Sequence, residues 1–192
     1  SDCWVEDSRL VILNARDARQ RGARIMPRTE VVCAERRGSC WRILTKNTET
    51  GESSTFLAKC LINAAGPWVE DIIKNKVKQR SSGELRLVRG SHIVTRKLYD
   101  HEKSYLFQGE DGRVIFTIPY ETDFTLIGTT DVDHSDLSQQ PFCSEEEKDY
   151  LLAFASSYFR TAVQRTDIVA SFSGVRPLYN DGAINASNAT RD

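Results

Sequence analysis

The amino-acid sequence predicts an α+β protein with two lobes: part of an α/β lobe over residues 1–80, and a mostly antiparallel sheet with helices over residues 81–192. The first lobe combines a helical pattern and a β-hairpin with a continuous apolar run. Such a run is typical of a strand that is buried on both faces of a parallel sheet. The second lobe contains four strand-like segments joined by short turns, which is the pattern of an antiparallel sheet.

Three elements are predicted before the apolar run. Apolar residues on one side of residues 7–21, followed by Gly22, predict a helix with a glycine at its C-terminal end. Residues 30–46 are rich in valine, tryptophan and isoleucine and have an Arg-Gly-Ser turn at residues 37–39, which predicts a β-hairpin. Residues 54–60 are a third strand candidate after a polar turn.

The apolar run, residues 60–65, ends where small side chains meet a second helical segment. Ala64, Ala65 and Gly66 stand at this junction, and the helical pattern begins at Trp68. Small residues between a strand and a helix allow a tight turn, or the close approach of a bulky group to the backbone. The local sequence supports both interpretations.

The second lobe ends with a helix and one more strand. Ser144 and Glu147 have the spacing of a capping box, in which the hydroxyl and the carboxylate each satisfy an unpaired backbone N–H group. The predicted buried stripe of this helix consists of Leu151, Phe154, Ala155 and Tyr158. The predicted strands are residues 84–96, 104–108, 112–120, 124–131 and 167–178, with an Asp-Gly hairpin turn at residues 111–112.

The composition excludes several classes of protein. Lys and Arg number 26 and Asp and Glu number 27, for a net charge of −1, which gives no support for a nucleic-acid partner. The five cysteines are odd in number and lack a CxxC spacing, which argues against a disulfide framework and fits a reduced, cytoplasmic setting. No apolar stretch approaches the roughly 20 residues that span a bilayer, so any membrane attachment is expected to be peripheral or to lie in residues outside this sequence.

Three side chains are candidates for binding or catalysis. Arg176, in SFSGVRPLYN, lies at the end of an apolar strand, where a fixed guanidinium can bind a phosphate or carboxylate or form a structural ion pair. Arg191, in NATRD, is by itself an ordinary surface residue, but two converging arginines would suit a dianionic phosphate. His92, in VRGSHIVT, is either a general base, because the ordinary pKa of histidine lies near neutrality, or a hydrogen-bonded histidine of the sheet.

No metal site is expected. Asp131, Asp133 and Asp136 lie close together in the sequence, but they lack the ligand spacing and the glycine of an EF-hand loop. The phosphate-binding motif Gly-x-x-x-x-Gly-Lys, the dinucleotide-binding motif Gly-x-Gly-x-x-Gly and the nucleophile motif Gly-x-Ser-x-Gly are also missing from the sequence.

The sequence resembles the flavin-dependent (aerobic) glycerol-3-phosphate dehydrogenases over essentially its whole length. The segments SDCWVEDSRLV, LINAAGPWV, RGSHIV, IGTTDVD, SGVRPL and TRD occur in the order and approximate spacing of that family. NAAGPWV is shared with the wider class of amino-acid-oxidase-like flavoproteins. The opening SDCWV, together with GSHIV and SGVRPL, is more specific.

The resemblance implies an enzyme that oxidises sn-glycerol 3-phosphate to dihydroxyacetone phosphate, with hydride transfer to FAD and electrons passed to a membrane quinone. It places His92 in the active site, where it would act as the base, and Arg176 and Arg191 at the substrate phosphate or beside the flavin ring. The positions that it implies for cofactor binding are Glu30, Val31, Ala64, Ala65, Gly66 and Gly174.

The family also has a Gly-rich strand, turn and helix that hold the FAD pyrophosphate, and these are expected before Ser1. A further family segment is expected after Asp192. We therefore expect this chain to be an internal part of a cytoplasmic enzyme that is peripherally associated with the membrane. By itself the chain should bind FAD weakly or not at all and should be inactive.

Two other functions stay open at this point. One is a related FAD-dependent oxidase, of the glycerophosphate or amino-acid type, that passes electrons to oxygen; release of peroxide by the full-length protein would identify it. The other is a non-catalytic ligand-binding module, which a gene encoding only this segment would support. The SGVRPL segment with a second arginine favours a phosphate over an amino acid as the ligand.

Overall fold

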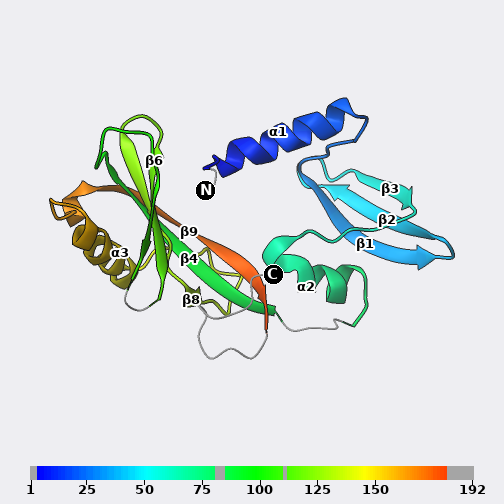
Figure 1. The fold of residues 1–192 in the computed structure, drawn as a ribbon. Coiled ribbons are helices and arrows are strands. Elements are labelled where there is room, and N and C mark those ends of the chain that lie inside the picture. The colour runs from blue at the N-terminus through cyan, green and yellow to red at the C-terminus, as the bar shows by residue number, and fades with distance from the viewer. Residues whose placement is uncertain (1–3, 81–84, 110–111, 181–192) are drawn as a thin grey trace. The chain divides into compact units, whose positions relative to one another are not determined.

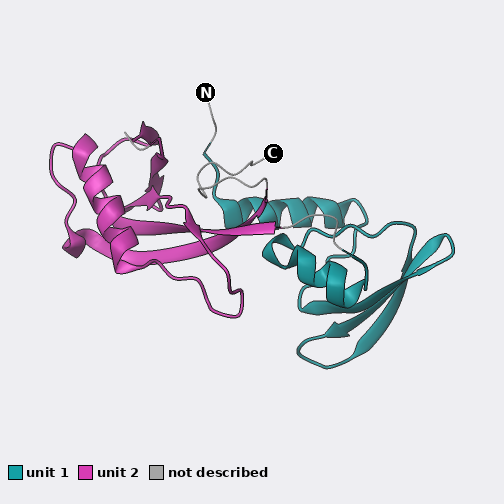
Figure 2. Ribbon diagram, turned by 90° about the horizontal axis from the view of Figure 1, so that it is seen from below, with its two compact units in different colours: residues 1–81 teal, residues 82–192 magenta. Residues whose placement is uncertain are grey.

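The computed structural model of the chain describes residues 4–80, 85–109 and 112–180, and Figure 1 shows the elements in chain order. Two compact units divide the chain, Ser1–Ser81 and Ser82–Asp192, drawn in teal and magenta in Figure 2. Helices accompany antiparallel sheets in the described residues, and the predicted α+β class is confirmed.

Unit 1 contains a three-stranded antiparallel sheet in the order β1-β2-β3. Its strands are β1 (Thr29–Arg37), β2 (Cys40–Asn47) and β3 (Ser53–Ala58). Arg37 pairs with Cys40 across the turn between β1 and β2, where Gly38 has a φ of +60°. A positive φ is what a tight hairpin turn requires, so the predicted hairpin is confirmed together with its turn.

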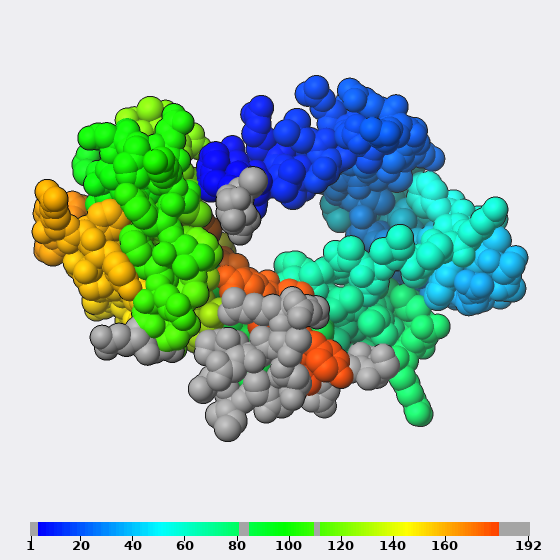
Figure 3. Space-filling model, in the orientation of Figure 1, coloured from blue at the N-terminus to red at the C-terminus, as the bar shows by residue number. Residues whose placement is uncertain are grey.

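Helix α1 (Asp7–Gln20) is the predicted N-terminal helix. It ends as predicted, because Gly22 has a φ of +97° and its N–H donates to the Arg19 carbonyl at 3.0 Å. None of its residues is buried, and Val11 remains 67% exposed. The side chains of α1 therefore lie at the surface of unit 1, in blue in Figure 3.

The apolar run at residues 60–65 does not form the predicted buried parallel strand. No strand is formed there, and the Ile62 side chain is 84% exposed. A parallel strand needs neighbouring strands to bond its N–H and carbonyl groups, and none of the described residues pairs with this segment. The helical segment that follows consists of η1 (Gly66–Trp68), α2 (Val69–Asp71) and η2 (Ile72–Lys76).

Unit 2 is built on an antiparallel sheet with β4 (Leu85–Arg96) at its centre, and six strands of it lie in the described residues. β4 pairs with β7 and β8 along one edge and with β9 along the other. The remaining strands are β5 (Tyr105–Gln108), β6 (Val114–Tyr120), β7 (Phe124–Gly128), β8 (Val132–Asp133) and β9 (Ile168–Tyr179). The predicted strands of this lobe are confirmed; the predicted hairpin turn includes Asp111, which lies outside the described residues.

Helix α3 (Glu145–Tyr158) packs against β4 and β7 on one face of this sheet (Figure 1). Its predicted capping box is confirmed: the Glu147 N–H donates to Ser144 Oγ at 3.2 Å, and the Ser144 N–H donates to Glu147 Oε2 at 2.9 Å. The hydrophobic core between helix and sheet consists of Ile93, Ile115, Ile127, Cys143, Leu151, Leu152, Ala155 and Val163.

The predicted stripe of α3 is right for Leu151 and Ala155, which are fully buried, and wrong for Tyr158, which is 47% exposed. The Tyr158 hydroxyl donates to the Gln108 carbonyl at 2.7 Å, and its ring stacks on Phe107 of β5. A tyrosine hydroxyl needs a polar partner, and the edge strand supplies one that the apolar core does not.

Two general features of the described residues bear on the setting of the protein. No helix among them has both the length and the apolar composition that crossing a membrane requires. Cys33, Cys40, Cys60 and Cys143 are free thiols. Burial, reinforced by the nearby Glu147 carboxylate, raises the pKa of the Cys143 thiol, so this group is an apolar part of the core rather than a reactive thiolate.

Candidate active site

The face of the unit 2 sheet opposite α3 carries a small cavity. Side chains alternate between the two faces of a strand, so the burial of Ile93 beneath α3 places His92 on the opposite face. The cavity has a volume of about 220 Å³. It is lined by His92, Phe116, Ile118, Leu126, Gly128, Thr129 and Arg176. The fold thus brings two of the three predicted site residues, His92 and Arg176, into one cavity.

The imidazole of His92 is confined by its neighbours on both adjoining strands. His92 pairs with Gly128 of β7 and with Phe172 of β9. The Phe172 ring stacks on the imidazole, with a centroid distance of 5.0 Å and an interplanar angle of 11°. A Cβ at position 128 would lie 2.1 Å from His92 Cδ2, so the ring occupies the space that any side chain at that position would need.

Two residues of the segment that connects β7 to β8 bind the guanidinium of Arg176. Its Nη1 donates to Asp131 Oδ1 at 2.9 Å, and its Nη2 donates to Thr129 Oγ1 at 3.2 Å. A Cβ at position 90 would lie 2.5 Å from Thr129 Oγ1 and 2.7 Å from Arg176 Nη2. Gly90 therefore leaves the space in which the guanidinium lies, as Gly128 does for the imidazole.

Arg176 keeps the capacity to bind an anion although it forms a structural ion pair. A guanidinium has five N–H donors, and the two hydrogen bonds to Thr129 and Asp131 fix its plane. The side chain of Arg176 is 36% exposed, whereas that of Asp131 is 10% exposed. The largely buried carboxylate thus anchors the guanidinium, and among the described residues only Asp131 and Thr129 are seen to accept from its donors. A guanidinium held in this way can offer further donors to an oxyanion in the cavity.

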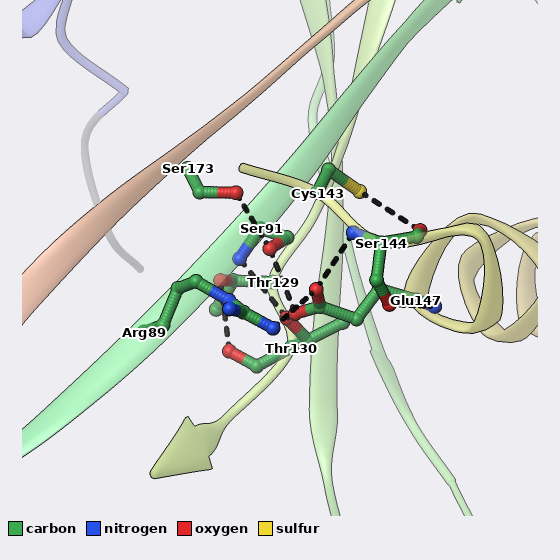
Figure 4. Close-up of polar contacts among 8 residues, drawn as sticks. All are labelled: Arg89, Ser91, Thr129, Thr130, Cys143, Ser144, Glu147 and Ser173. Atoms are coloured by element: carbon green, nitrogen blue, oxygen red, sulfur yellow. Dashed lines mark hydrogen bonds and ion pairs between the residues drawn. The ribbon is translucent and has the colours of Figure 1, made fainter. Parts of the chain in front are cut away.

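A buried polar network lies on the α3 side of the same strands (Figure 4). Glu147 accepts hydrogen bonds from Thr130 Oγ1 and Ser91 Oγ, each at 2.7 Å, and from Arg89 Nη2 at 2.8 Å. Burial by itself raises the pKa of the Glu147 carboxyl. The hydrogen bonds from the Ser144 N–H and the two hydroxyls, with the charge of Arg89, outweigh burial and leave the pKa below its ordinary value.

The three aspartates near this segment have separate partners. Asp131 is paired with Arg176, and Asp133 accepts two hydrogen bonds from Arg86 at 2.7 and 2.8 Å. These bonds lower the pKa of Asp133. Asp136 accepts from the Ser138 N–H at 2.8 Å. Across residues 4–80, 85–109 and 112–180, no three His, Cys, Asp or Glu side chains are grouped in a way that could hold a metal ion.

Two predicted cofactor positions, Glu30 and Val31, lie on β1 of unit 1. The Glu30 carboxylate accepts a hydrogen bond from Lys76 Nζ at 2.8 Å, and this bond lowers the pKa of Glu30. The pairing of β1 with β2 is interrupted by an irregularity between Val31 and Cys33. Such irregularities change the direction of side chains along a strand; Glu30 is exposed and Val31 is half-buried.

The junction at residues 64–66 is a tight turn with open space beside it. The Asn63 side chain ties it down, because Nδ2 donates to the Val69 carbonyl at 2.9 Å and Oδ1 accepts from the Ala65 N–H at 3.3 Å. Gly66 has a φ of +56°, and a Cβ there would meet no atom within 4 Å. Ala64 is exposed. The positive φ of this turn thus explains the glycine.

The last two predicted positions have different outcomes. Gly174 of β9 is exposed and pairs with Gly90 of β4, and a Cβ at position 174 would meet no atom within 4 Å. The surface above it is therefore open. Arg191 lies outside the described residues, so its position beside Arg176 stays a prediction.

The sequence matches the protein family described as FAD dependent oxidoreductase (DAO) over residues 1–188. The chain belongs to this family. Its cofactor class, FAD, agrees with the resemblance seen in the sequence motifs.

Several known proteins are similar to the chain. A D-erythritol 1-phosphate dehydrogenase of Brucella abortus is 48% identical over 192 residues, covering 100% of this chain and 38% of that protein. A glycerol-3-phosphate dehydrogenase of Pseudomonas tolaasii is 42% identical over 194 residues, covering 100% and 37%. The solved glycerol-3-phosphate dehydrogenase of Bacillus halodurans, complexed with FAD, matches with a TM-score of 0.78 at 29% identity, covering 93% of this chain and 36% of that one. The chain thus spans little more than a third of the length of these relatives.

Sequence reasoning missed the residues that support the two cavity side chains. Thr129 was noted only within the motif IGTTDVD, Asp131 was considered only as a metal ligand, and Phe172 was noted only as part of a strand. The signal that could have found Phe172 and Gly128 is strand alternation, because both share the face of His92. Nothing local connects Asp131 with Arg176, because 45 residues separate them.

Proposed function

We propose that the full-length protein that carries this chain oxidises a polyol phosphate, sn-glycerol 3-phosphate in the first instance, at its secondary alcohol. The alcohol loses a hydride from carbon and a proton from oxygen, and the product is the ketone dihydroxyacetone phosphate. FAD supplies the hydride-accepting chemistry when it is bound. The observation that carries the proposal is the cavity shared by His92 and Arg176, because it combines a proton acceptor with a fixed cation.

His92 is the proposed general base. An alcohol releases hydride more readily as its proton is removed, and a neutral imidazole nitrogen can accept that proton from the hydroxyl oxygen. The Phe172 ring stacks on the imidazole and fixes its plane. Gly128 has no side chain and leaves the space that the imidazole occupies. A fixed ring plane keeps the accepting nitrogen directed at one point, which is the condition for efficient proton transfer.

Arg176 is the proposed ligand of the substrate phosphate, with Arg191 as the second. The planar guanidinium matches two phosphate oxygens, and its bonds to Thr129 and Asp131 orient it before substrate arrives. A cavity of about 220 Å³ is smaller than the roughly 300–1,000 Å³ pockets of drug-sized ligands. This size supports a substrate as small as a three- or four-carbon polyol phosphate.

The cofactor positions divide between the two units. In unit 1, Glu30 and Val31 are proposed to approach the adenosine half of FAD, and the turn at residues 64–66 lies against the cofactor. In unit 2, Gly174 is proposed to lie beside it. The open space at the Cβ positions of Gly66 and Gly174 supports these assignments, because a flat ring system can approach the backbone there.

The proposed electron acceptor is a membrane quinone. The full-length protein would then be a cytoplasmic enzyme that is peripherally associated with the cytoplasmic membrane. The relatives named as dehydrogenases support a dehydrogenase. The alternative is an oxidase that uses oxygen. Peroxide released by the full-length protein during turnover would identify an oxidase, and quinone reduction without peroxide would support the proposal.

The central test is reduction of the flavin by substrate. Anaerobic addition of sn-glycerol 3-phosphate to the FAD-loaded full-length protein is expected to bleach the flavin absorbance. In the variant His92→Asn the rate of bleaching should fall about 100-fold, because a general base contributes on the order of 10²–10⁴-fold. An unchanged rate in His92→Asn would remove the proposed base, and no bleaching by any polyol phosphate would refute the function.

D-erythritol 1-phosphate is the second candidate substrate. The observation that favours it is the 48% identity to a relative of that name, against 42% for the glycerol-3-phosphate dehydrogenase. Both compounds join a phosphate ester to a short polyol, so the roles of His92 and Arg176 are the same for either. A comparison of kcat/KM for the two compounds decides which is the substrate.

Gly174→Ala tests the cofactor site. A Cβ at this position meets no atom of the described residues within 4 Å, so this sheet accommodates the methyl group without change. If the cofactor lies over Gly174, we expect FAD to bind about tenfold more weakly, as for other overpacked contacts. Titration of the full-length apoprotein with FAD, followed by flavin fluorescence, measures this. An unchanged dissociation constant would place the cofactor elsewhere.

A further inference from the structure

Glu147 connects helix α3 to the strands that frame the cavity (Figure 4). Its Oε1 accepts from Ser91 Oγ of β4 and from Thr130 Oγ1 of the β7–β8 connection, each at 2.7 Å. Thr130 Oγ1 also accepts from the Ser91 N–H at 3.0 Å. Ser91 Oγ lies 2.7 Å from Ser173 Oγ of β9. One carboxylate therefore ties three segments of the sheet to the helix.

The capping box does not account for this arrangement. Capping uses Oε2, which accepts from the Ser144 N–H at 2.9 Å, and a surface glutamate can cap in the same way. The Glu147 side chain is only 6% exposed. A buried carboxylate is costly unless donors surround it, and here Arg89, Ser91 and Thr130 supply them in addition to the cap.

The contacts of the β7–β8 connection alternate between the two faces of the sheet. Thr130 donates to Glu147 on the α3 side. Its two chain neighbours, Thr129 and Asp131, accept from Arg176 in the cavity on the other side. Because adjacent residues share a short backbone segment, the anchor at Thr130 also sets where Thr129 and Asp131 present their oxygen atoms.

We propose that Glu147 is a positioning residue that orients the Arg176 guanidinium from the opposite face of the sheet, through Thr130. This inference rests on the proposed function, in which Arg176 binds the substrate phosphate. Loss of the Glu147 anchor lets the β7–β8 connection shift, and the oxygen atoms that hold Arg176 shift with it. The phosphate site is then poorly organised although no residue in the cavity has changed.

Two variants of the full-length enzyme test the inference. Glu147→Gln keeps the size of the side chain but removes its charge and one acceptor, and Thr130→Val removes the hydroxyl that joins Glu147 to the connection. Each is expected to raise the KM for the polyol phosphate about tenfold with a smaller change in kcat, a size typical of coupled residues. Matched controls are Glu146→Gln, an exposed carboxylate in the same helical turn, and Thr117→Val, a buried threonine whose hydroxyl has no hydrogen-bond partner within the described residues.

A double-mutant cycle separates positioning from general damage to the fold. If Glu147 acts through Arg176, Glu147→Gln should raise KM no further once Arg176 is already alanine. A purely structural role predicts a similar additional loss in both backgrounds. Equal KM values for Glu147→Gln, Thr130→Val and the wild-type enzyme would overturn the inference.

A crystal structure of the Glu147→Gln enzyme gives a readout that does not depend on turnover. We expect the bonds from Arg176 to Thr129 and Asp131 to be lengthened or broken, from 3.2 and 2.9 Å. Unchanged bonds would refute the positioning role even if the enzyme oxidises polyol phosphates. Displaced bonds in an enzyme that oxidises none would instead refute the proposed function and leave the positioning role standing.

Discussion

Replacing Gly128 with alanine is expected to lower the kcat of the full-length enzyme by about 100-fold or more, the range in which a general base contributes. The reason is steric. A Cβ at position 128 would lie 2.1 Å from Cδ2, 2.7 Å from Cγ and 2.8 Å from Nε2 of His92. Atoms that are not bonded do not approach so closely, so the imidazole must leave its position stacked on Phe172, or β7 must move.

The control for this prediction is the same substitution in a background without the imidazole. The three nearest atoms to the added Cβ all belong to His92. Gly128→Ala should therefore cost little more in a His92→Ala enzyme, which already lacks the base. Steady-state kinetics of the two single variants and the double variant measure the coupling. Full additivity would mean that Gly128→Ala acts by disturbing the sheet and not by displacing His92.

Replacing Arg176 with alanine is expected to lower kcat/KM by between about 30-fold and about 5,000-fold, mainly through KM. Truncating one partner of a hydrogen-bonded charge pair costs about 2–5 kcal/mol. Here two interactions are lost, because the phosphate loses a cation and Asp131, whose side chain is 10% exposed, loses its ion pair with Arg176. Steady-state kinetics with sn-glycerol 3-phosphate and D-erythritol 1-phosphate give the split between KM and kcat.

Two further variants distinguish these two losses. Arg176→Lys keeps the positive charge but not the planar pair of donors, so its KM should lie between those of wild type and Arg176→Ala. Asp131→Asn in the Arg176→Ala background removes the carboxylate charge that Arg176 faced, and should restore stability without restoring KM. A KM close to the wild-type value in Arg176→Ala would mean that the phosphate binds elsewhere and that the Arg176–Asp131 pair is structural.

Local sequence patterns predicted most secondary structure of this chain. The turn glycines Gly22 and Gly38 marked the end of α1 and the β1–β2 turn, and both have the positive φ that such positions favour. The capping pair Ser144 and Glu147 marked the start of α3. These features depend on residues within one turn of each other, so the order of amino acids is enough to specify them.

Local patterns failed where the outcome depends on distant partners. The apolar run at residues 60–65 has the composition of a buried strand, but a strand forms only beside another strand, and none of the described residues pairs with it. Tyr158 has the helical spacing of a buried residue, but its hydroxyl is bonded to the carbonyl of Gln108 on the edge strand. Composition alone carries no information about such neighbours.

The sequence by itself determined the fold class, the order of the strands in unit 2 along the chain, and the membership of the chain in a flavoprotein family. Only the tertiary structure decided how the site is assembled. His92 and Arg176 meet because β9 pairs with β4 in a register that sets Phe172 against His92. Arg176 is fixed by Asp131, 45 residues earlier. Strand register and contacts between distant residues depend on the packing of the whole unit, and for that reason they could not be read from any single segment.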